Sequence, residues 1–332
     1  MSGGTTLEIG PDDAGQRVDR FVRKYLPRAT LSLVFKLLRT KQVTVNGRKA
    51  RPEDRLAEGD ALTLFLGERL RDLRGGAGRG RGAGPPAPPR LEVLHRDGDV
   101  LAVNKPARLL VHEGDAGDEP TLLSAVLREF PGRKAHTFRP ALAHRLDRDT
   151  SGVVLVGLTA RGLRGLEEAL RRRKVRKTYL ALVAGVPEPR SGTVDAPLRR
   201  QEFTTGDRAK VFVGGARDPA AVTEYRVVRE AGGFALVEAF PRTGRTHQIR
   251  VHLRHIGHPV LGDPTYGDRA RNEEARRRLG LWRPFLHALR VELAHPVTGE
   301  RLVIEAPLPE ELRRVLEGAG LAAGGPRGRP GG

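Results

Sequence analysis

A charged loop that leads directly into an apolar run constrains the fold of this chain more than any other stretch. The loop covers residues 144–152 (HRLDRDTSG), and four aliphatic residues, 153–156 (VVLV), follow it. Such a run predicts a buried strand. Asp147 and Asp149 then lie where a polar loop enters a core sheet, which is a common way to hold a catalytic group on a rigid support. A purely structural role for these residues is equally open. In that case residues 149–151 form a turn and Asp147 pairs with an arginine.

The charge of the chain indicates a polyanionic partner. The 332 residues carry a formal net charge of +19, and nucleic acid is the leading candidate for a compact protein this basic. An anionic membrane surface is the rival, but no apolar stretch approaches the ~18 residues of a bilayer-spanning segment. Residues 1–10 lack the apolar core of a signal peptide. The chain has no cysteine, which excludes disulfides, thiol catalysis and cysteine zinc sites and fits a cytoplasmic location.

Changes in composition divide the chain into four segments. Its length suggests about two domains. We expect a small α/β domain over residues 11–70, a flexible Gly/Arg/Pro linker over 71–90, a large domain over 91–316 and a disordered tail over 317–332. The linker and the tail are rich in glycine, arginine and proline, and such segments bury too little apolar surface to fold.

The first domain has the pattern of helices followed by a hairpin. Apolar spacing predicts one helix from Val18 and a second over 31–39, capped by Thr30. Asn46-Gly47 between strand-like runs predicts a tight hairpin turn. Four basic residues surround this hairpin, and they serve either as phosphate contacts or as an ordinary solvated surface: Arg39, Lys41, Arg48 and Lys49.

The large domain has many strand-like runs and few helices. Helices are expected over 122–130 and 160–173. The strand-like runs are residues 100–103, 153–156, 179–183, 222–228, 234–239 and 302–304. Strands with few helices between them are typical of antiparallel pairing rather than of βαβ units. The fold class predicted for the whole chain is therefore α+β, with a mixed, mainly antiparallel sheet.

Two further stretches carry chemistry. Tyr179 opens a strand two residues after Lys177, and its ring can either pack at the rim of the core or stack on a base. Residues 244–252 (GRTHQIRVH) predict a turn, a Thr246 N-cap and a helix. Arg250 falls off the apolar stripe of that helix, so it is either an exposed cation or the partner of a carboxylate.

The histidines near this helix do not form a convincing metal site. Four of them lie at positions 247, 252, 255 and 258, without a His-x-x-x-His pair accompanied by a glutamate base. Packed or hydrogen-bonded side chains are the better account. We expect neither a metal nor a cofactor.

The three polar stretches together resemble the RluA-type pseudouridine synthases. His-Arg-Leu-Asp-x-x-Thr-Ser-Gly is similar to the family's active-site signature, and Lys-x-Tyr, Gln-Ile-Arg and residues 261–267 (LGDPTYG) are similar to other family elements. The resemblance covers about 91–316 and implies a pseudouridine synthase fold. It implies that Asp147 is the catalytic carboxylate, that Tyr179 stacks on the target base and that Arg250 pairs with Asp147. The residues it implies in substrate binding are Arg145, His144, Lys177, Arg245 and His247.

The first domain resembles an S4-type RNA-binding domain, with the hairpin after Val43 and a later Gly59-Asp60. Within the family such a domain accompanies the enzymes of large-subunit ribosomal RNA, with the RluC branch the nearest and the RluD branch second. The implied activity is the isomerisation of uridines within bacterial large-subunit rRNA by an enzyme expected to be a monomer. A tRNA-specific or dual-specificity synthase, a noncatalytic RNA-binding or ribosome-assembly protein and a metal-dependent nuclease using Asp147 and Asp149 are the alternatives.

Overall fold

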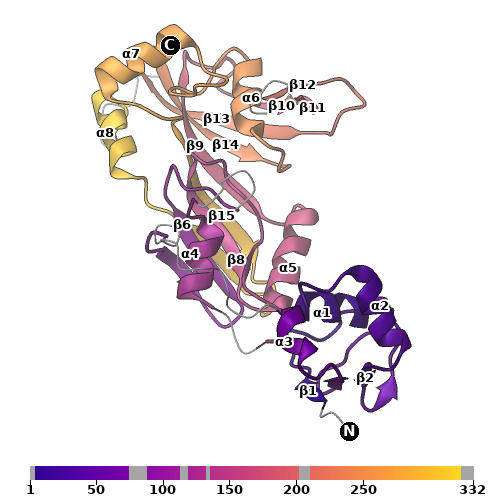
Figure 1. Cartoon of the computed structure of the whole chain (residues 1–332). Coiled ribbons are helices and arrows are strands. Elements are labelled where there is room, and N and C mark those ends of the chain that lie inside the picture. Colours follow the sequence, from indigo (N-terminus) through magenta and orange to yellow (C-terminus); the bar gives the residue numbers. More distant parts are fainter. Residues whose placement is uncertain (1–3, 75–87, 113–118, 132–134, 202–209, 323–332) are drawn as a thin grey trace.

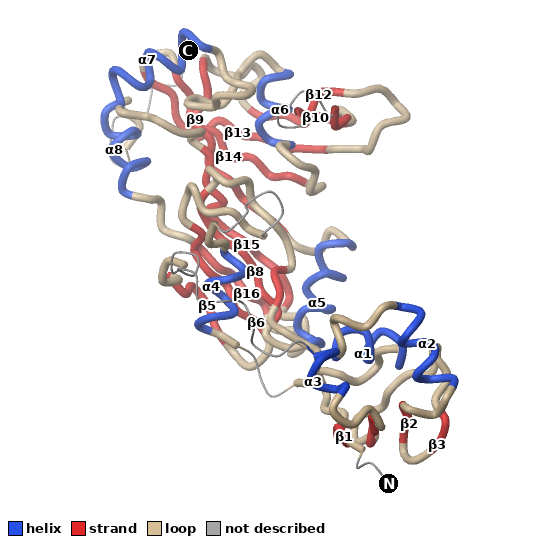
Figure 2. Tube along the Cα trace, in the orientation of Figure 1, coloured by secondary structure: helices blue, strands red, loops and turns tan. Residues whose placement is uncertain are grey.

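Two large sheets, each with its own hydrophobic core, organise the chain in the computed structural model (Figure 1). The structure describes residues 4–74, 88–112, 119–131, 135–201 and 210–322. We call residues 5–74 the N-terminal unit and residues 92–322 the large unit. The helices lie around the sheets (Figure 2), and nearly all strand pairs are antiparallel, which confirms the predicted α+β class.

The N-terminal unit is a four-stranded sheet covered by helices. Its elements are β1 (Thr5–Glu8), α1 (Val18–Tyr25), α2 (Leu31–Arg39), β2 (Val43–Val45), β3 (Arg48–Lys49), β4 (Ala61–Leu64) and α3 (Arg69–Arg74). The sheet order is β1-β4-β2-β3. Thr30 caps α2 as expected, because its side chain accepts the Leu33 N–H at 3.2 Å. The turn at Asn46-Gly47 has two positive φ angles, 50° and 72°, as a two-residue hairpin turn requires.

The boundaries of this unit differ from those expected. Strand β1 precedes residue 11 and pairs with β4. Its pattern was too short to recognise, because Leu7 is its only buried residue. Helix α3 occupies the start of the expected linker, because Leu70 and Leu73 pack against the core of the unit. The rest of the linker prediction, over residues 75–87, lies outside the described residues.

The large unit is built on a ten-stranded sheet. Its main path is β10-β13-β14-β9-β15-β8-β6-β5, with β16 beside β15 and β7 beside β8. All of its strand pairs are antiparallel except β15 with β8, which confirms the mixed, mainly antiparallel sheet. The strands are β5 (Glu92–Arg96), β6 (Val100–Lys105), β7 (Ala141–Leu142), β8 (Ser151–Gly157), β9 (Arg176–Ala184), β10 (Ser191–Asp195), β13 (Val222–Ala231), β14 (Phe234–Pro241), β15 (Leu286–Ala294) and β16 (Arg301–Glu305). A separate pair joins β11 (Leu198–Gln201) to β12 (Lys210–Val213).

The burial of strand β8 on both faces explains why its sequence is continuously apolar. All seven of its residues are buried. Val154 and Val156 join one hydrophobic cluster, whereas Val153 and Leu155 join another. Because successive side chains point to opposite faces of a sheet, a strand covered on both faces needs an apolar residue at every position.

Five helices cover or flank this sheet. They are α4 (Leu122–Glu129), α5 (Ala160–Arg171), α6 (Gln248–His255), α7 (Arg269–Leu279) and α8 (Glu310–Gly318). In Figure 1, α5 extends beside the sheet towards the N-terminal unit, and α6 lies at the opposite end near β10 and β12. Within the described residues, we find no helix long and apolar enough to cross a membrane.

The predicted start of the disordered tail, residue 317, is too early in the chain. Helix α8 continues to Gly318, and Leu321 is only 1% exposed in a core shared with α7. Gly320 makes this possible, because its positive φ of 72° ends the helix and lets the Leu321 N–H bond the Leu316 carbonyl at 2.7 Å. Residues 323–332 lie outside the described residues.

Candidate active site

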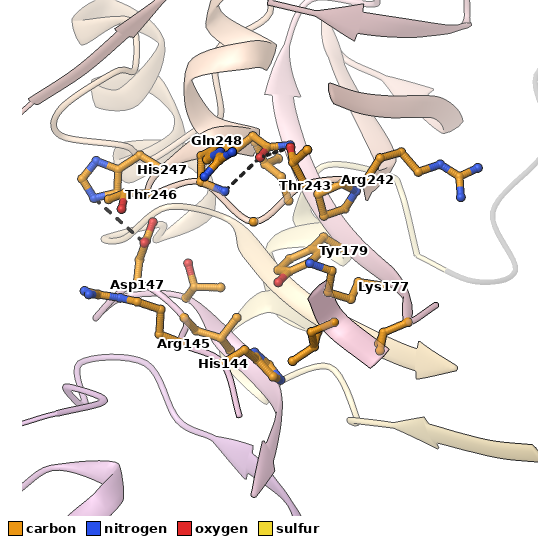
Figure 3. Close-up of a pocket in the computed structure, with 18 of the residues that line it drawn as sticks. His144, Arg145, Asp147, Lys177, Tyr179, Arg242, Thr243, Thr246, His247 and Gln248 are labelled. Atoms are coloured by element: carbon orange, nitrogen blue, oxygen red, sulfur yellow. Dashed lines mark hydrogen bonds and ion pairs between the residues drawn. The ribbon is translucent and has the colours of Figure 1, made fainter. Parts of the chain in front are cut away.

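A pocket of about 570 Å³ opens where the charged loop faces α6 and the start of β9. The loop after β7 contributes residues 143–147 and Thr150, the end of α5 contributes Arg171 and Arg173, and the turn before α6 contributes residues 241–247. Figure 3 shows Asp147 beside His247 at one side of this pocket, with Tyr179 and Lys177 at the other, on β9. The structure therefore brings together Asp147, Tyr179 and Arg250, the three residues singled out in the sequence.

The carboxylate of Asp147 stands on a tight turn between β7 and β8. The Thr150 N–H bonds the Asp147 carbonyl at 3.1 Å, and the side chain of Asp147 remains 23% exposed. At the end of this loop, Gly152 has a φ of 119°, and a Cβ there would lie 2.2 Å from the Ala288 carbonyl oxygen of β15. Only glycine therefore lets the loop enter the sheet at this point.

Arg250 joins Asp147 to a second carboxylate. Its Nη1 donates to Asp147 Oδ2 at 3.0 Å, while Nε and Nη2 donate to Asp263 Oδ2 and Oδ1 at 2.6 and 2.8 Å. The Arg250 side chain is only 8% exposed, so it is not an exposed helix cation. Burial alone would lower the pKa of Arg250, but the hydrogen bonds and charge of Asp263, followed by those of Asp147, raise it above its usual value.

Arg250 makes one hydrogen bond to Asp147 and two to Asp263, so Asp263 is its bidentate partner. Asp263 is fully buried, and its Oδ1 also accepts the backbone N–H groups of Thr265 and Tyr266 at 2.9 and 3.0 Å. Burial favours a protonated carboxyl, but the bonds and charge of Arg250 outweigh it and lower the pKa of Asp263. The sequence signal for this residue was an acid in the Gly262-Asp263-Pro264 turn.

His247 has a local conformation that the sequence did not reveal. Its φ of 56° places it in the left-handed region, and α6 begins at Gln248 without a cap from Thr246, so the predicted Thr246 N-cap is wrong. The Gln248 side chain satisfies the turn instead, because its Oε1 accepts the Arg245 N–H at 3.0 Å and the Thr243 hydroxyl at 2.6 Å.

Both ring nitrogens of His247 have polar neighbours. The Tyr266 hydroxyl oxygen accepts the Val211 N–H at 2.8 Å and lies 2.8 Å from His247 Nδ1. Burial lowers the pKa of His247, although the Asp147 charge opposes this. His247 Nδ1 therefore bonds Tyr266, while Nε2 faces Asp147 Oδ1, 3.9 Å away.

Tyr179 and His144 are held in uncharged forms. Tyr179 is 9% exposed, and burial, followed by the Asp147 charge, raises the pKa of its phenol. His144 accepts the Leu155 N–H at 3.1 Å on Nε2. Burial and the nearby Lys177 charge lower the pKa of His144 to about 4, so a neutral imidazole supports the loop. Burial also lowers the pKa of Lys177.

Lys105, at the end of β6, is a buried support that was not recognised in the sequence. It is 0% exposed, and its Nζ donates to the carbonyls of Pro106, Leu109 and Arg148 at 2.8–2.9 Å. Burial lowers the pKa of Lys105 to about 7. Through Arg148, this amine ties the loop that carries Asp147 to β6. The available sequence signal was a lysine ending an apolar strand.

The remaining candidates lie at the edge of the pocket or outside it. Arg145 and Arg245 line the pocket but are exposed, and Arg245 Nε donates to the Ala220 carbonyl at 3.2 Å. The four basic residues of the N-terminal unit are exposed and do not line the pocket: Arg39, Lys41, Arg48 and Lys49.

The histidines near α6 are engaged in hydrogen bonds. His252 Nδ1 lies 2.9 Å from Thr223 Oγ1, and its Nε2 lies 3.0 Å from the Ala196 carbonyl. His258 Nδ1 lies 2.9 Å from the Ala184 carbonyl. No cluster of three or more potential metal-binding side chains is found among the residues the structure describes.

The chain is similar to known proteins over most of its length. The family model described as RNA pseudouridylate synthase matches residues 99–255. The chain is 37% identical over 323 residues to the "Ribosomal large subunit pseudouridine synthase C" of Salmonella typhi, and likewise to that of Escherichia coli strain K12. Each match covers 94% of this chain and 95% of the relative.

Solved structures support the fold of the large unit. The chain is similar to "Human RNA Pseudouridylate Synthase Domain Containing 4", with a TM-score of 0.55 and 28% identity over 69% of this chain and 92% of that one. "Human RNA Pseudouridylate Synthase Domain Containing 1" gives a TM-score of 0.53 and 28% identity over 66% of this chain and 84% of that chain. The expected pseudouridine synthase fold is thereby confirmed.

Replacing the buried amine should destabilise the protein. We predict that Lys105→Met lowers the free energy of unfolding by at least about 2 kcal/mol, because each buried carbonyl left without a donor costs about 1–3 kcal/mol. Urea-induced unfolding measures the difference. Lys49→Met, which changes the same side chain on an exposed strand, is the control and should stay within about 0.5 kcal/mol of wild type. Equal stability of the two variants would contradict the assigned role of Lys105.

Proposed function

The chain belongs to the RNA pseudouridine synthase family, and from that premise we propose that it isomerises specific uridines in bacterial large-subunit ribosomal RNA, with Asp147 as the catalytic carboxylate. As a family member it is an enzyme, an isomerase acting on RNA. The observation that carries the proposed mechanism is the placement of Asp147 in a pocket beside Tyr179, with its carboxylate bonded to the buried Arg250–Asp263 pair.

The reaction moves a glycosidic bond without changing the oxidation state of the substrate. The bond between C1′ and N1 of uridine breaks, the uracil turns, C5 bonds to C1′, the proton on C5 leaves, and N1 takes up a proton. The carboxylate of Asp147 serves either as a nucleophile at C1′ or as a base at the 2′ position, and both roles need it ionised. A guanidinium that donates to a carboxylate fixes its direction, and Arg250 does this for Asp147.

Tyr179 acts through its ring in this proposal. Its buried phenol has a raised pKa, which makes a phenolate at neutral pH unfavourable and disfavours general-base chemistry by its oxygen. A flat ring on the pocket wall can instead stack on the uracil, an interaction worth about 1–3 kcal/mol per base.

The rim of the pocket supplies cations for an extruded nucleotide. A base within a folded RNA must leave its stack to reach a carboxylate in a pocket. Arg145 is exposed beside Asp147, and Arg171, Arg173 and Arg245 also line the opening. We assign Arg145 to holding the flipped state and the others to the flanking phosphates, while Lys177, His144 and His247 shape the inner wall.

The N-terminal unit supports a long, folded RNA as the substrate. Its hairpin and the end of α2 expose Arg39, Lys41, Arg48 and Lys49. Phe35 lies one helical turn before Arg39 and is 42% exposed, so an aromatic ring and a cation lie side by side on α2, a combination that RNA-binding surfaces use. We propose that this unit is an S4-like RNA-binding domain, and the names of the relatives favour large-subunit rRNA over tRNA as the substrate.

We further propose that the enzyme acts as a monomer in the cytoplasm, where ribosomal RNA is available for modification. One pocket holds Asp147, Tyr179 and Arg250 from a single chain, so the proposed chemistry needs no residue from a second copy.

The first test removes the proposed catalytic group. Asp147→Asn should abolish C5-tritium release from labelled large-subunit rRNA while RNA affinity stays within a few-fold, because the amide keeps the shape but supplies no carboxylate. Asp149→Asn is the control and should be far milder, since we assign Asp149 to the turn. Wild-type-like release by Asp147→Asn would refute the mechanism, and RNA cleavage by the wild type would instead favour a nuclease.

The second test concerns the RNA-binding role of the N-terminal unit. Replacing Arg39, Lys41, Arg48 and Lys49 together by glutamine should weaken rRNA binding and reduce its salt dependence. The slope of log K against log salt should become shallower by about 0.7–0.9 for each phosphate that the variant no longer neutralises. Filter binding at several salt concentrations gives this slope.

A charge-matched control separates direct phosphate binding from net charge. Glutamine at four exposed arginines that already pair with glutamates should leave the slope nearly unchanged: Arg190, Arg226, Arg301 and Arg313. An equal change of slope in both quadruple variants would show that overall charge, rather than the N-terminal unit, holds the RNA.

A further inference from the structure

Two consecutive acids of the N-terminal unit are buried against the large unit. Asp13 is 0% exposed and Asp12 is 8% exposed. Composition had indicated that these residues belong to a small domain carried by a flexible linker. Buried carboxylates are costly unless hydrogen bonds replace their water, so their partners show what this pair of acids does.

The hydrogen-bond partners of the Asp13 carboxylate belong to one short segment of the large unit. Its Oδ1 accepts the Thr137 N–H at 3.0 Å, the Thr137 hydroxyl at 2.6 Å and the Phe138 N–H at 3.2 Å. Its Oδ2 accepts the His136 N–H at 2.6 Å. Gln16 Nε2 adds a bond to Thr137 Oγ1 at 3.0 Å. One carboxylate therefore binds three consecutive residues more than 120 positions away in the chain.

Aromatic contacts reinforce this junction. The His136 ring meets the rings of Phe21 and Tyr25 edge-on, with centroids 6.3 and 6.2 Å apart. Its Nε2 lies 2.9 Å from the Glu8 carbonyl. The segment around His136 therefore contacts both the Asp13 carboxylate and helix α1 of the N-terminal unit.

Asp12 binds the beginning of α5. Its Oδ1 accepts the Ala160 N–H at 2.8 Å, and this N–H is one of those that a helix leaves without an internal partner. A negative charge at this end also suits the helix dipole. Figure 1 shows the N-terminal unit directly beyond this end of α5.

Helix α5 connects this junction to the active-site pocket. Its opposite end carries Arg171 and Arg173, which line the pocket. Twelve residues of α-helix span about 18 Å. The helix is fixed on the sheet, because Leu166 is fully buried and because a Cβ at Gly162 would lie 2.3 Å from the Asp99 carbonyl. The N-terminal unit is thus held at a set distance from Asp147.

We propose that the hydrogen bonds of Asp12 and Asp13, which we call the latch, fix the N-terminal unit against α5. The distance between the basic hairpin and the pocket is then constant, and this distance selects which uridine of a long RNA is modified. This inference rests on the proposed function. A rigid second binding surface raises the effective concentration of only those uridines that lie at the matching distance from the RNA segment it binds. A freely tethered unit would allow many distances.

Spin labels test the latch in the absence of RNA. The chain has no cysteine, so Glu58→Cys in the N-terminal unit and Glu167→Cys on α5, both exposed, give one labelled pair. Double electron–electron resonance should show one narrow distance distribution, and Asp13→Ala should broaden it. Asp72→Ala removes an exposed acid of the same unit and should leave the distribution narrow. A distribution that is broad without the Asp13 change, or unchanged by it, would overturn the latch.

A second experiment tests site selection by the full-length enzyme. Mapping pseudouridines in large-subunit rRNA should show that Asp13→Ala loses preference for its main site by about tenfold or more, whereas its turnover of a short stem-loop carrying that uridine stays at the wild-type value. Asp72→Ala should match the wild type in both assays. Unchanged site preference despite a broadened distance distribution would overturn the role in selection.

The two experiments separate the latch from the proposed substrate. If the wild type modified no uridine of large-subunit rRNA, the proposed function and the selection role would both fail. The distance distributions would still decide whether Asp12 and Asp13 hold the two units together.

Discussion

A buried guanidinium shared by two carboxylates is the interaction on which this site depends. Arg250 is 8% exposed and Asp263 is 0% exposed, and the cost of removing these charges from water is offset only because every bond between them is well formed. Asp263 takes two of the arginine's nitrogens and leaves Nη1 for Asp147. The fully buried acid therefore orients the cation, and the cation orients the acid that faces the pocket.

The same pair organises the turn at residues 263–266. Thr265 and Tyr266 donate backbone N–H groups to Asp263, and the Tyr266 ring lies under the Arg250 guanidinium at 4.9 Å from its centroid. The Tyr266 hydroxyl then fixes the His247 ring, whose other nitrogen faces Asp147. Lys105 secures the opposite side through the Arg148 carbonyl. The proposed catalytic carboxylate is thus held from α6, from the 261–267 turn and from β6.

Local patterns predicted the elements well, whereas long-range contacts remained hidden. The VVLV run indicated β8, Thr30 indicated the start of α2, and the Gln-Ile-Arg resemblance anticipated the bond from Arg250 to Asp147. Spacing alone does not show that Asp263 would take the bidentate position or that Lys105 would bind a carbonyl 43 residues away. Because the Asp13 contacts span more than 120 residues, composition indicated a loose tether where the structure shows a junction. The Thr246 N-cap was wrongly predicted because side-chain bonds of Gln248 stabilise this turn instead.

Single-turnover kinetics of Asp263→Asn would test the central claim most directly, since this residue lies behind Arg250 and is fully buried. The account predicts that C5-tritium release slows by about tenfold or more, the loss expected when a supporting partner is removed, while the Kd for the same RNA stays within a few-fold. A crystal structure of the variant should show the Arg250–Asp147 bond lengthened or broken. Wild-type release with that bond displaced would contradict the claim that the buried Arg250–Asp263 pair positions the catalytic carboxylate.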